Sequence, residues 1–342
     1  MSKLKVLVTA EVIREKLEER FADRLEFVYD GYCLDHQVMP HDELCRKVKG
    51  VDVLVCEYDT ITKDVLGAAD RLRLIICCRG GVKSVIDLAA AREKGVTVCN
   101  NAGRNAGAVT DLAMAFILDL TRHVTLTSNL IHAKELVGET STKPGEYRDT
   151  VWGLDNDSPF IRYRGRSICH MTLGIVGFGN AGRSLARKAG AFGMKVIAYS
   201  PHLDDTNTPS SVGHVSFEEL LARADVVSVH CSLTPQTRDM FTRREFLMME
   251  RGAYFINTAR GEIVVEEDLV DALKSGHLAG AALDVTRREP IPADSPLVGC
   301  PNLLVTPHIG GSSDDVQVCG TEMVAASLDA YLDGLMPPHR VA

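Results

Sequence analysis

The chain has a single tryptophan, Trp152, among 342 residues, and no apolar run long enough to span a bilayer. It also lacks a surplus of positive charge, because 38 Lys and Arg face 46 Asp and Glu. Nucleic acids and anionic membranes are bound by positively charged faces, so neither is an expected partner. The N-terminal stretch MSKLKVLVTA has the apolar pattern of a strand and no signal-peptide core, which favours a cytoplasmic protein.

Cysteine is more frequent, but its spacing indicates neither disulfides nor a metal. Of the ten cysteines, Cys77 and Cys78 are adjacent, and the others are scattered without CxxC or Cys/His spacing. Cys56, Cys77 and Cys99 lie in apolar strand-like runs, where a thiol acts as a small hydrophobe. We therefore expect free structural cysteines in a reducing compartment, and no metal site.

The length of the chain exceeds one ordinary core, so we expect two domains. In the first hundred residues, short apolar strands alternate with amphipathic stretches, which predicts a parallel sheet with helices on both faces. The predicted strands are 5–9, 53–56, 72–77 and 96–100, and the predicted helices are 12–24, 61–69 and 85–95.

A second strand and helix alternation begins at Leu173 and predicts six strands, the number in a complete doubly wound sheet. The predicted strands are 173–177, 196–199, 226–230, 254–258, 280–284 and 303–306. The predicted helices between them are 181–192, 217–222, 243–249 and 266–274. We place the domain boundaries so that one domain holds residues 1–104 and 313–342 and the other holds 105–312.

Three further segments complete the predicted organisation. Residues 108–133 form a long helical stretch that is apolar nearly all round in its first half, so it should be buried, within the chain or against a second subunit. The last helix, 316–332, should pack back on the first domain. Residues 137–166 are rich in Gly, Pro, Asp, Thr and Ser, and form either an irregular insertion near a cleft or a plain surface loop.

The second domain opens with the glycine turn GFGNAG, which follows a strand and precedes a helix. Gly177 permits a tight turn, Gly179 lets the backbone approach a pyrophosphate, and Gly182 lets helix and strand pack closely. With Asn180 and Ala181, these residues form a helix N-terminus that attracts phosphates. The turn therefore predicts a dinucleotide site, and a glycine turn without ligand is the alternative.

The end of the next strand bears on the choice of dinucleotide. An acidic residue that binds the ribose hydroxyls is usual there, but this chain has Ser200. Without the acidic residue, a 2′-phosphate is not repelled, so NADP is tolerated. However, no Lys or Arg that could bind this phosphate occurs between Lys195 and Arg223, and two acidic residues lie at 204 and 205. Only His202 could contribute a positive charge, and histidine is mostly neutral near pH 7. We expect NAD as cofactor, with weakened discrimination against NADP.

Three later segments, FINTARGEIV, GAALDVTRREP and LLVTPHIGG, each end a strand with a polar group. They supply Arg260, Asp284 with Glu289, and His308. The carboxyl ends of parallel strands meet at one edge of a sheet, so these groups can converge. Arginine holds a carboxylate bidentately, and a carboxylate beside a histidine orients its ring and favours its protonated form. The set suits hydride transfer to a 2-oxo acid.

Each of these residues also has a structural interpretation. Arg260 can pair with Glu262 or Glu266 on the surface, Glu289 can cap its turn, and His308 can fill a loop. Taken singly, these interpretations are the better ones. In this order after the glycine turn, the residues favour catalysis.

The segments TLGIVGFGNAGR, VVSVHCSLTPQTRDMF, GAYFINTARGEIVVEEDL, LAGAALDVTRREP and LLVTPHIGG occur in this order. With them the chain resembles, over nearly its whole length, the D-isomer-specific 2-hydroxyacid dehydrogenases. The resemblance implies an α/β fold of two Rossmann/flavodoxin-like parallel-sheet domains, with the active site in the cleft between them. It also implies a homodimer formed through the second domain, and NAD-dependent interconversion of a small-molecule D-2-hydroxy acid and its 2-oxo acid.

The resemblance also assigns roles to residues. Arg260 would anchor the substrate carboxylate and carbonyl, His308 would be the general acid/base, and Glu289 would favour the protonated histidine. Main-chain N–H groups of Arg79, Gly80, Gly81 and Val82 would hold the substrate carboxylate. Asp284 would lie near the nicotinamide carboxamide. The cofactor would further be bound by Thr110, His230, Cys231, Thr237, Thr258, Ala259 and Gly310.

The substrate side departs from the usual family pattern. Ser84 and Val85 replace an Asp–Asn pair in the substrate loop, and GRNAGAV at 103–109 resembles a phosphoglycerate-dehydrogenase-like branch. Phosphoglycerate is one candidate substrate, since Arg79, Lys83 and Arg104 could meet a phosphate or else be surface residues. Hydroxypyruvate and glyoxylate are the others. An NAD-sensing protein like the corepressors that share this fold, without metabolic turnover, is the alternative function.

Overall fold

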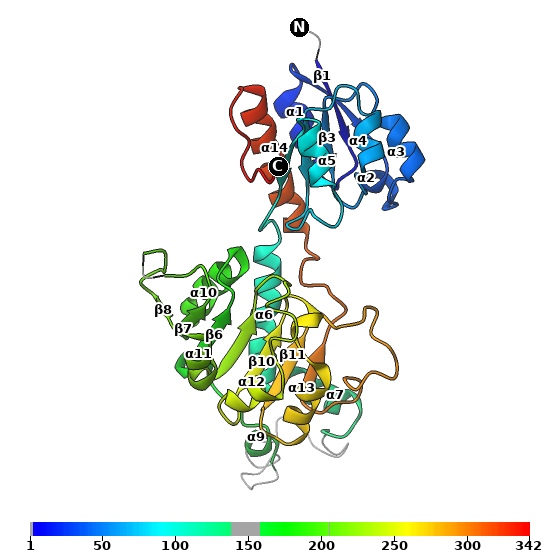
Figure 1. The fold of residues 1–342 in the computed structure, drawn as a ribbon. Coiled ribbons are helices and arrows are strands. Elements are labelled where there is room, and N and C mark those ends of the chain that lie inside the picture. The colour runs from blue at the N-terminus through cyan, green and yellow to red at the C-terminus, as the bar shows by residue number, and fades with distance from the viewer. Residues whose placement is uncertain (1–2, 138–157, 205) are drawn as a thin grey trace. The chain divides into compact units, whose positions relative to one another are not determined.

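The computed structural model describes residues 3–137, 158–204 and 206–342. The chain divides into two compact units, Met1–Ala108 with Ser312–Ala342 (unit 1) and Val109–Gly311 (unit 2) (Figure 1). The predicted boundaries lie at 104/105 and 312/313. The first falls earlier than in the structure because the start of helix α6 (Ala106–Arg122) is grouped with unit 1.

Unit 1 contains one parallel sheet of five strands, which confirms the predicted α/β architecture. From edge to edge the strands are β2 (Leu25–Tyr29), β1 (Leu4–Val8), β3 (Val53–Cys56), β4 (Leu74–Cys77) and β5 (Thr97–Asn100). This order is that of the flavodoxin-like fold. Strands β3 and β4 are buried at every residue, as expected for strands covered on both faces. The edge strand β2, only partly buried, was not predicted.

The helices of unit 1 come from both ends of the chain. The last one, α14, returns to unit 1 as predicted: Ile13 N–H donates to the Thr321 hydroxyl at 2.9 Å, and Val324 and Leu328 share a core with Leu17 and Phe21. Helices α2 and α3 were not predicted. The helices are α1 (Arg14–Phe21), α2 (Tyr32–Asp35), α3 (His41–Lys47), α4 (Lys63–Ala68), α5 (Leu88–Glu93) and α14 (Asp314–Leu332).

Unit 2 contains a parallel sheet of seven strands, one more than the six predicted. From edge to edge they are β12 (Leu303–Val305), β11 (Gly280–Leu283), β10 (Tyr254–Asn257), β9 (Val226–Val229), β6 (Thr172–Val176), β7 (Lys195–Tyr199) and β8 (Val212–His214). The strand order reverses on either side of β6, as in doubly wound dinucleotide-binding sheets. The extra strand β8 has three residues, two of them exposed, and so leaves little apolar pattern.

The prediction of one long helix over 108–133 is wrong in one respect, because the structure has two helices there, α6 and α7 (Val124–His132). His123 has a left-handed backbone (φ 57°) that ends α6, and the Asp119 carboxylate accepts the Thr125 N–H at 2.7 Å in the next turn. Helix α7 buries no residue, so the expected burial applies to α6 alone. The other helices are α9 (Pro159–Arg162), α10 (Asn180–Ala191), α11 (Phe217–Arg223), α12 (Arg243–Met248) and α13 (Glu266–Lys274).

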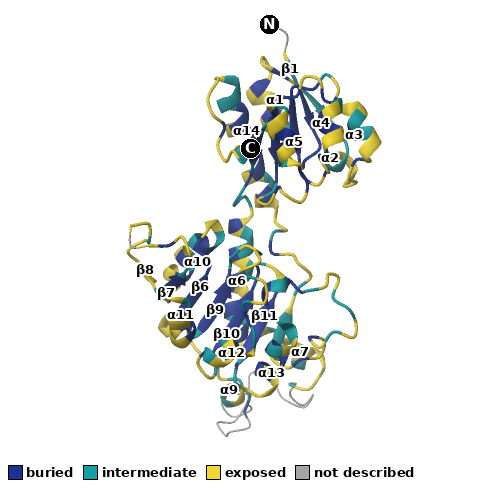
Figure 2. Ribbon diagram, viewed as in Figure 1, coloured by how far each residue is buried: buried dark blue, intermediate teal, exposed yellow. Residues whose placement is uncertain are grey.

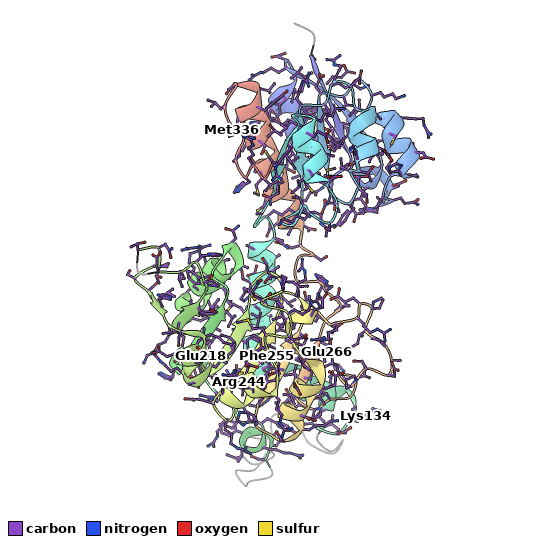
Figure 3. All side chains as sticks on the ribbon, viewed as in Figure 1. Lys134, Glu218, Arg244, Phe255, Glu266 and Met336 are labelled. Atoms are coloured by element: carbon purple, nitrogen blue, oxygen red, sulfur yellow. The ribbon has the colours of Figure 1, made fainter. Side chains whose placement is uncertain are left out.

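The central strands of each sheet are buried and the outer faces of the helices are exposed (Figure 2). Phe255 on β10, labelled in Figure 3, lies at the centre of the unit 2 core and is fully buried. Its ring centroid is 4.9 Å from that of Phe241 and 5.2 Å from that of Phe246. These aromatic contacts hold helix α12 and the segment before it against the sheet, below the ends of the strands.

Other predictions fall on particular segments. All ten cysteines are free, and Cys56, Cys77 and Cys99 are buried in strands, as expected. Of the predicted insertion at 137–166, residues 138–157 with Trp152 lie outside the described residues. Among the helices described here, none is both long enough and apolar enough to cross a bilayer.

Gly174 on β6 tests how closely helix α11 packs on the sheet. A Cβ at Gly174 would lie 2.7 Å from Leu220 Cδ2 and 2.8 Å from Ala224 Cβ. We expect Gly174→Ala to lower the free energy of unfolding by about 1–3 kcal/mol because of this overlap. The control Gly190→Ala has open space around its Cβ and should raise it by roughly 0.5 kcal/mol, since alanine favours a helix. Urea denaturation measures both, and equal stability of the two variants would contradict the expectation.

Candidate active site

The glycine turn lies between β6 and α10 at the carboxyl edge of the unit 2 sheet. Gly177 has φ 94°, and a Cβ there would lie 2.5 Å from Cys231 N, so both the turn and the backbone after β9 require glycine. A Cβ at Gly182 would lie 2.3 Å from the Gly177 carbonyl oxygen. Gly179, by contrast, faces open space. The turn therefore leaves room for a ligand only at Gly179.

Helix α10 starts directly after Gly179, with Asn180, Ala181 and Gly182 as its first turn. The positive end of the helix dipole thus points toward the open space at Gly179. Thr110 on α6, also a predicted cofactor residue, is fully buried, and its hydroxyl lies 3.0 Å from that of Ser184 on α10. The α10 N-terminus has the features that a pyrophosphate requires.

The segment after β7 begins with Ser200, whose Oγ lies 3.5 Å from the His202 N–H that it accepts. His202 is exposed, and its carbonyl accepts the Asn207 side-chain amide at 3.0 Å. Asp204 closes a turn on itself, accepting the N–H groups of Thr206 and Asn207. Asp205 lies outside the described residues. Ser200 and His202 are thus held in a compact turn at the end of the strand.

A cation reaches this segment from elsewhere in the chain. Both terminal nitrogens of Arg183 on α10 donate to the Asn207 carbonyl at 3.3 Å, and the guanidinium lies 4.9 Å from the Phe178 ring centroid. No Lys or Arg occurs between Lys195 and Arg223 in the sequence, but Arg183 from α10 brings a positive charge to this segment that was not predicted. The available signal was the position directly after the last glycine of the turn, on the first turn of α10.

The backbone that packs on Gly177 belongs to His230 and Cys231, which follow β9. Burial lowers the pKa of the His230 imidazole to about 4, and its Nε2 lies 2.8 Å from the Ser228 hydroxyl. Burial likewise raises the pKa of the Cys231 thiol to about 11. Both groups are therefore neutral near pH 7. Farther along this loop, the Thr237 hydroxyl donates to the Ser232 carbonyl at 2.7 Å and closes a local turn.

The segment after β10 is shaped by Asn257, which the sequence analysis did not single out. Its side-chain amide donates to the Arg260 carbonyl at 2.8 Å and its oxygen accepts the Ala259 N–H at 3.0 Å. Arg260 is exposed and, among the described residues, forms no ion pair, so the predicted surface pairs with Glu262 or Glu266 are not found. Thr258 has a buried hydroxyl without a hydrogen-bond partner in the described chain.

Gly261 joins the Arg260 segment to the loop after β11. A Cβ at Gly261 would lie 2.0 Å from the carbonyl carbon of Thr286, so only glycine allows this approach. The Thr286 N–H donates to Glu289 Oε1 at 3.2 Å. The close contact thereby brings the segments that carry Arg260 and Glu289 to neighbouring positions.

The predicted acid/base pair is formed in the structure. Glu289 Oε2 lies 2.7 Å from His308 Nδ1, while its other oxygen caps Thr286, so the capping interpretation of Glu289 and the pairing coexist. Both side chains remain accessible, at 40% and 46% exposure. His308 has a left-handed backbone (φ 57°), which costs energy for a residue with a Cβ and is typical of functional sites.

Asp284 at the end of β11 holds the segment that carries His308. Its Oδ1 accepts the Thr306 hydroxyl at 2.6 Å and the Ile309 N–H at 2.8 Å, and its Oδ2 accepts the Gly310 N–H at 2.8 Å. The main-chain N–H of His308 donates to the Asp284 carbonyl at 2.8 Å. A Cβ at Gly310 would lie 2.7 Å from Oδ2, so glycine is needed there. Asp284 thus sets the backbone on which His308 stands.

In unit 1, the predicted substrate loop follows β4. Its carbonyls are held from β5, because the Asn100 side chain donates to the Gly80 carbonyl at 2.7 Å and the Asn101 N–H to that of Arg79 at 3.2 Å. Within residues 3–137, 158–204 and 206–342, no acceptor is bonded to the N–H groups of Gly80, Gly81 and Val82. Consecutive unbonded N–H groups are suited to an anion.

The three cations expected near a phosphate differ in their surroundings. Arg104 forms an ion pair with the buried Glu57, with side-chain exposures of 15% and 3%. Arg79 lies over the Tyr58 ring at 5.3 Å, and Lys83 is exposed. Arg104 is therefore already neutralised inside unit 1.

Comparison with known proteins agrees with this geometry. Residues 114–310, more than half of the chain, match the family described as D-isomer specific 2-hydroxyacid dehydrogenase, NAD binding domain. A hydroxypyruvate reductase of Thermotoga maritima is 35% identical over 280 residues, covering 81% of this chain and 83% of that protein. A glyoxylate reductase of Thermococcus litoralis is 33% identical over 309 residues, covering 90% and 88%. The solved structure of the TT0316 protein of Thermus thermophilus has 34% identity and a TM-score of 0.74, with 99% and 100% covered.

The chain belongs to the D-isomer-specific 2-hydroxyacid dehydrogenase family. It is accordingly an NAD-dependent oxidoreductase with two parallel-sheet α/β domains. The resemblance stated from the sequence motifs is confirmed.

The depressed pKa of His230 predicts a pH dependence of stability. The folded state keeps this ring neutral down to about pH 4, whereas an unfolded histidine binds its proton near pH 6.5. Its contribution is thus complete above pH 6.5 and is lost as the pH falls toward 4, by roughly 1.4 kcal/mol per unit. In urea denaturation over this range, wild type should lose stability relative to His230→Gln as the pH falls. A constant difference would contradict a buried neutral ring.

Proposed function

We propose that this dehydrogenase interconverts a short, unphosphorylated D-2-hydroxy acid and its 2-oxo acid, with His308 as general acid/base. The observation that carries this proposal is the 2.7 Å contact between His308 Nδ1 and Glu289 Oε2 on a backbone fixed by Asp284. When Nδ1–H donates to the carboxylate, Nε2 is left to exchange a proton with the substrate oxygen.

Arg260 anchors the substrate in this proposal. Its exposed guanidinium forms no ion pair among the described residues, so its charge is available to the carboxylate and carbonyl oxygen of a 2-oxo acid. In unit 1, taken by itself, the unbonded N–H groups of Gly80, Gly81 and Val82 are suited to bind a carboxylate. As the carbonyl becomes an alkoxide, Arg260 stabilises the developing charge until His308 delivers the proton.

The cofactor residues fit the same reaction. NAD(H) supplies or accepts the hydride when bound. The open space at Gly179 and the α10 N-terminus suit the pyrophosphate, and the buried unpartnered hydroxyl of Thr258 is available to a ligand. Asp284 positions His308, and Ser200, His230 and Ala259 follow the ends of β7, β9 and β10.

The surroundings of Arg104 favour an unphosphorylated substrate. A phosphate would have to compete with Glu57 for this guanidinium, and separating a buried pair is costly. The relatives described above are named hydroxypyruvate reductase and glyoxylate reductase, and both of these acids lack a phosphate. We therefore rank glyoxylate and hydroxypyruvate above the phosphorylated acid.

We further propose a cytoplasmic homodimer formed through unit 2. Helix α7 exposes Val124, Leu126 and Ile131 at 56%, 46% and 50%, and Phe160 on α9 is 67% exposed. Exposed apolar side chains in larger number than a monomer needs are typical of protein interfaces. The free cysteines support a reducing compartment.

A substrate panel tests the proposed activity. Glyoxylate, hydroxypyruvate and phosphohydroxypyruvate are each offered with NADH, and the nicotinamide absorbance is followed. We expect reduction of the two unphosphorylated acids, with kcat/KM at least about tenfold above that for the phosphorylated one. A factor of this size corresponds to the loss of one charge-assisted contact with the phosphate. A reversed ranking would overturn the substrate choice. Tight NADH binding without reduction of any acid would favour the corepressor-like alternative.

His308→Ala separates a catalytic role from a structural one. We expect kcat to fall by about 10²–10⁴-fold, the usual contribution of a general acid, while the NADH dissociation constant stays nearly unchanged. The control His170→Ala, at an exposed position outside the site, should leave both quantities unchanged. Loss of cofactor affinity together with turnover in His308→Ala would show that the histidine is structural.

A further inference from the structure

The end of β7 lacks the charge that normally excludes NADP. In sites specific for NAD, an acidic residue binds the ribose hydroxyls and repels a 2′-phosphate. Here the position holds Ser200. The nearest described acid, Asp204, uses Oδ1 to accept the Thr206 N–H at 2.8 Å, the Thr206 hydroxyl at 2.6 Å and the Asn207 N–H at 3.1 Å. The Thr206 hydroxyl bond lowers the pKa of Asp204, so this carboxylate stays ionised but points into its own turn.

Arg183 supplies a positive charge to the same segment. Its two terminal nitrogens share the Asn207 carbonyl, and the Asn207 side chain in turn bonds the carbonyl of His202, two residues after Ser200. The Phe178 ring supports the guanidinium from a second side. In the described part of the chain, Arg183 forms no ion pair. Its charge is therefore pre-oriented and, among the described residues, not paired with a carboxylate.

We propose that Arg183 binds the 2′-phosphate of NADP(H), so that the ribose end of the site accepts NADP(H) as well as NAD(H). A guanidinium matches phosphate geometry and forms charge-assisted hydrogen bonds with it, and each nitrogen that donates to one carbonyl retains a second N–H. Ser200 adds a hydroxyl that donates to the ribose or its phosphate. This inference rests on the dinucleotide site of the glycine turn and not on the choice of substrate.

The experiment measures binding and needs no turnover. Isothermal titration calorimetry gives dissociation constants for NAD⁺ and NADP⁺ with wild type, Arg183→Ala and Arg187→Ala. Arg187 lies one turn farther along α10 and is exposed, so it controls for a general loss of positive charge on the helix. We expect wild type to bind NADP⁺ within about tenfold of NAD⁺. Arg183→Ala should weaken NADP⁺ about ten- to hundredfold, the range for charge-assisted bonds, and NAD⁺ by less than about threefold.

A second variant tests the same idea by adding charge. Ser200→Asp restores the missing carboxylate, so it should weaken NADP⁺ by at least about tenfold while NAD⁺ binds as well as before or better. Raising the salt concentration should weaken NADP⁺ binding to wild type more than to Arg183→Ala, because the phosphate contact is ionic.

Two results would overturn the inference while leaving the dinucleotide site intact. One is wild-type binding of NADP⁺ more than about a hundredfold weaker than that of NAD⁺, a gap larger than a missing charge-assisted bond leaves. The other is an equal loss of both dinucleotides in Arg183→Ala, which would mean that the arginine only supports the loop. If wild type binds neither dinucleotide, the glycine-turn site itself is wrong.

Discussion

The chemistry of unit 2 depends on how the Asp284 carboxylate binds the segment after β12. Three donors from Thr306, Ile309 and Gly310 end on its two oxygens, and the His308 N–H ends on its carbonyl. These bonds help to offset the cost of the left-handed backbone of His308. The buried Asp284 carboxylate thus determines the position of the backbone that carries His308.

Close backbone contacts assemble the rest of the strand edge. Gly177 lets the backbone after β9 pack against the glycine turn, and Gly182 lets the first turn of α10 pack against the Gly177 carbonyl. Gly261 admits the loop after β11, which places the Arg260 and Glu289 segments together. At each position a methyl group would overlap main-chain atoms, which cannot move aside as a flexible side chain can. The site is therefore organised by the absence of side chains as much as by the reactive groups.

The sequence was sufficient for the two sheets, because buried parallel strands give unbroken apolar runs such as those of β3 and β4. It failed at β2 and β8, which lie at sheet edges and are only partly buried. Motif order pointed to Arg260, Glu289 and His308, but not to Asn257, whose role is to hold a turn. Arg183 was missed because its contact with Asn207 joins residues that are distant in the sequence. Such contacts follow from folding, and the only sequence signal for Arg183 was its position directly after the last glycine of the turn.

The path of the chain has a consequence for biosynthesis. Unit 1 is begun by the first residues and completed only by Ser312–Ala342, whose helix α14 covers Leu17 and Phe21. Unit 2 lies between these parts and is complete once Gly311 has been made. During translation the second unit therefore has its whole sequence before the first does, and the apolar face of α1 stays uncovered until α14 has been made. The nascent chain must keep that face from aggregating while its neighbour folds.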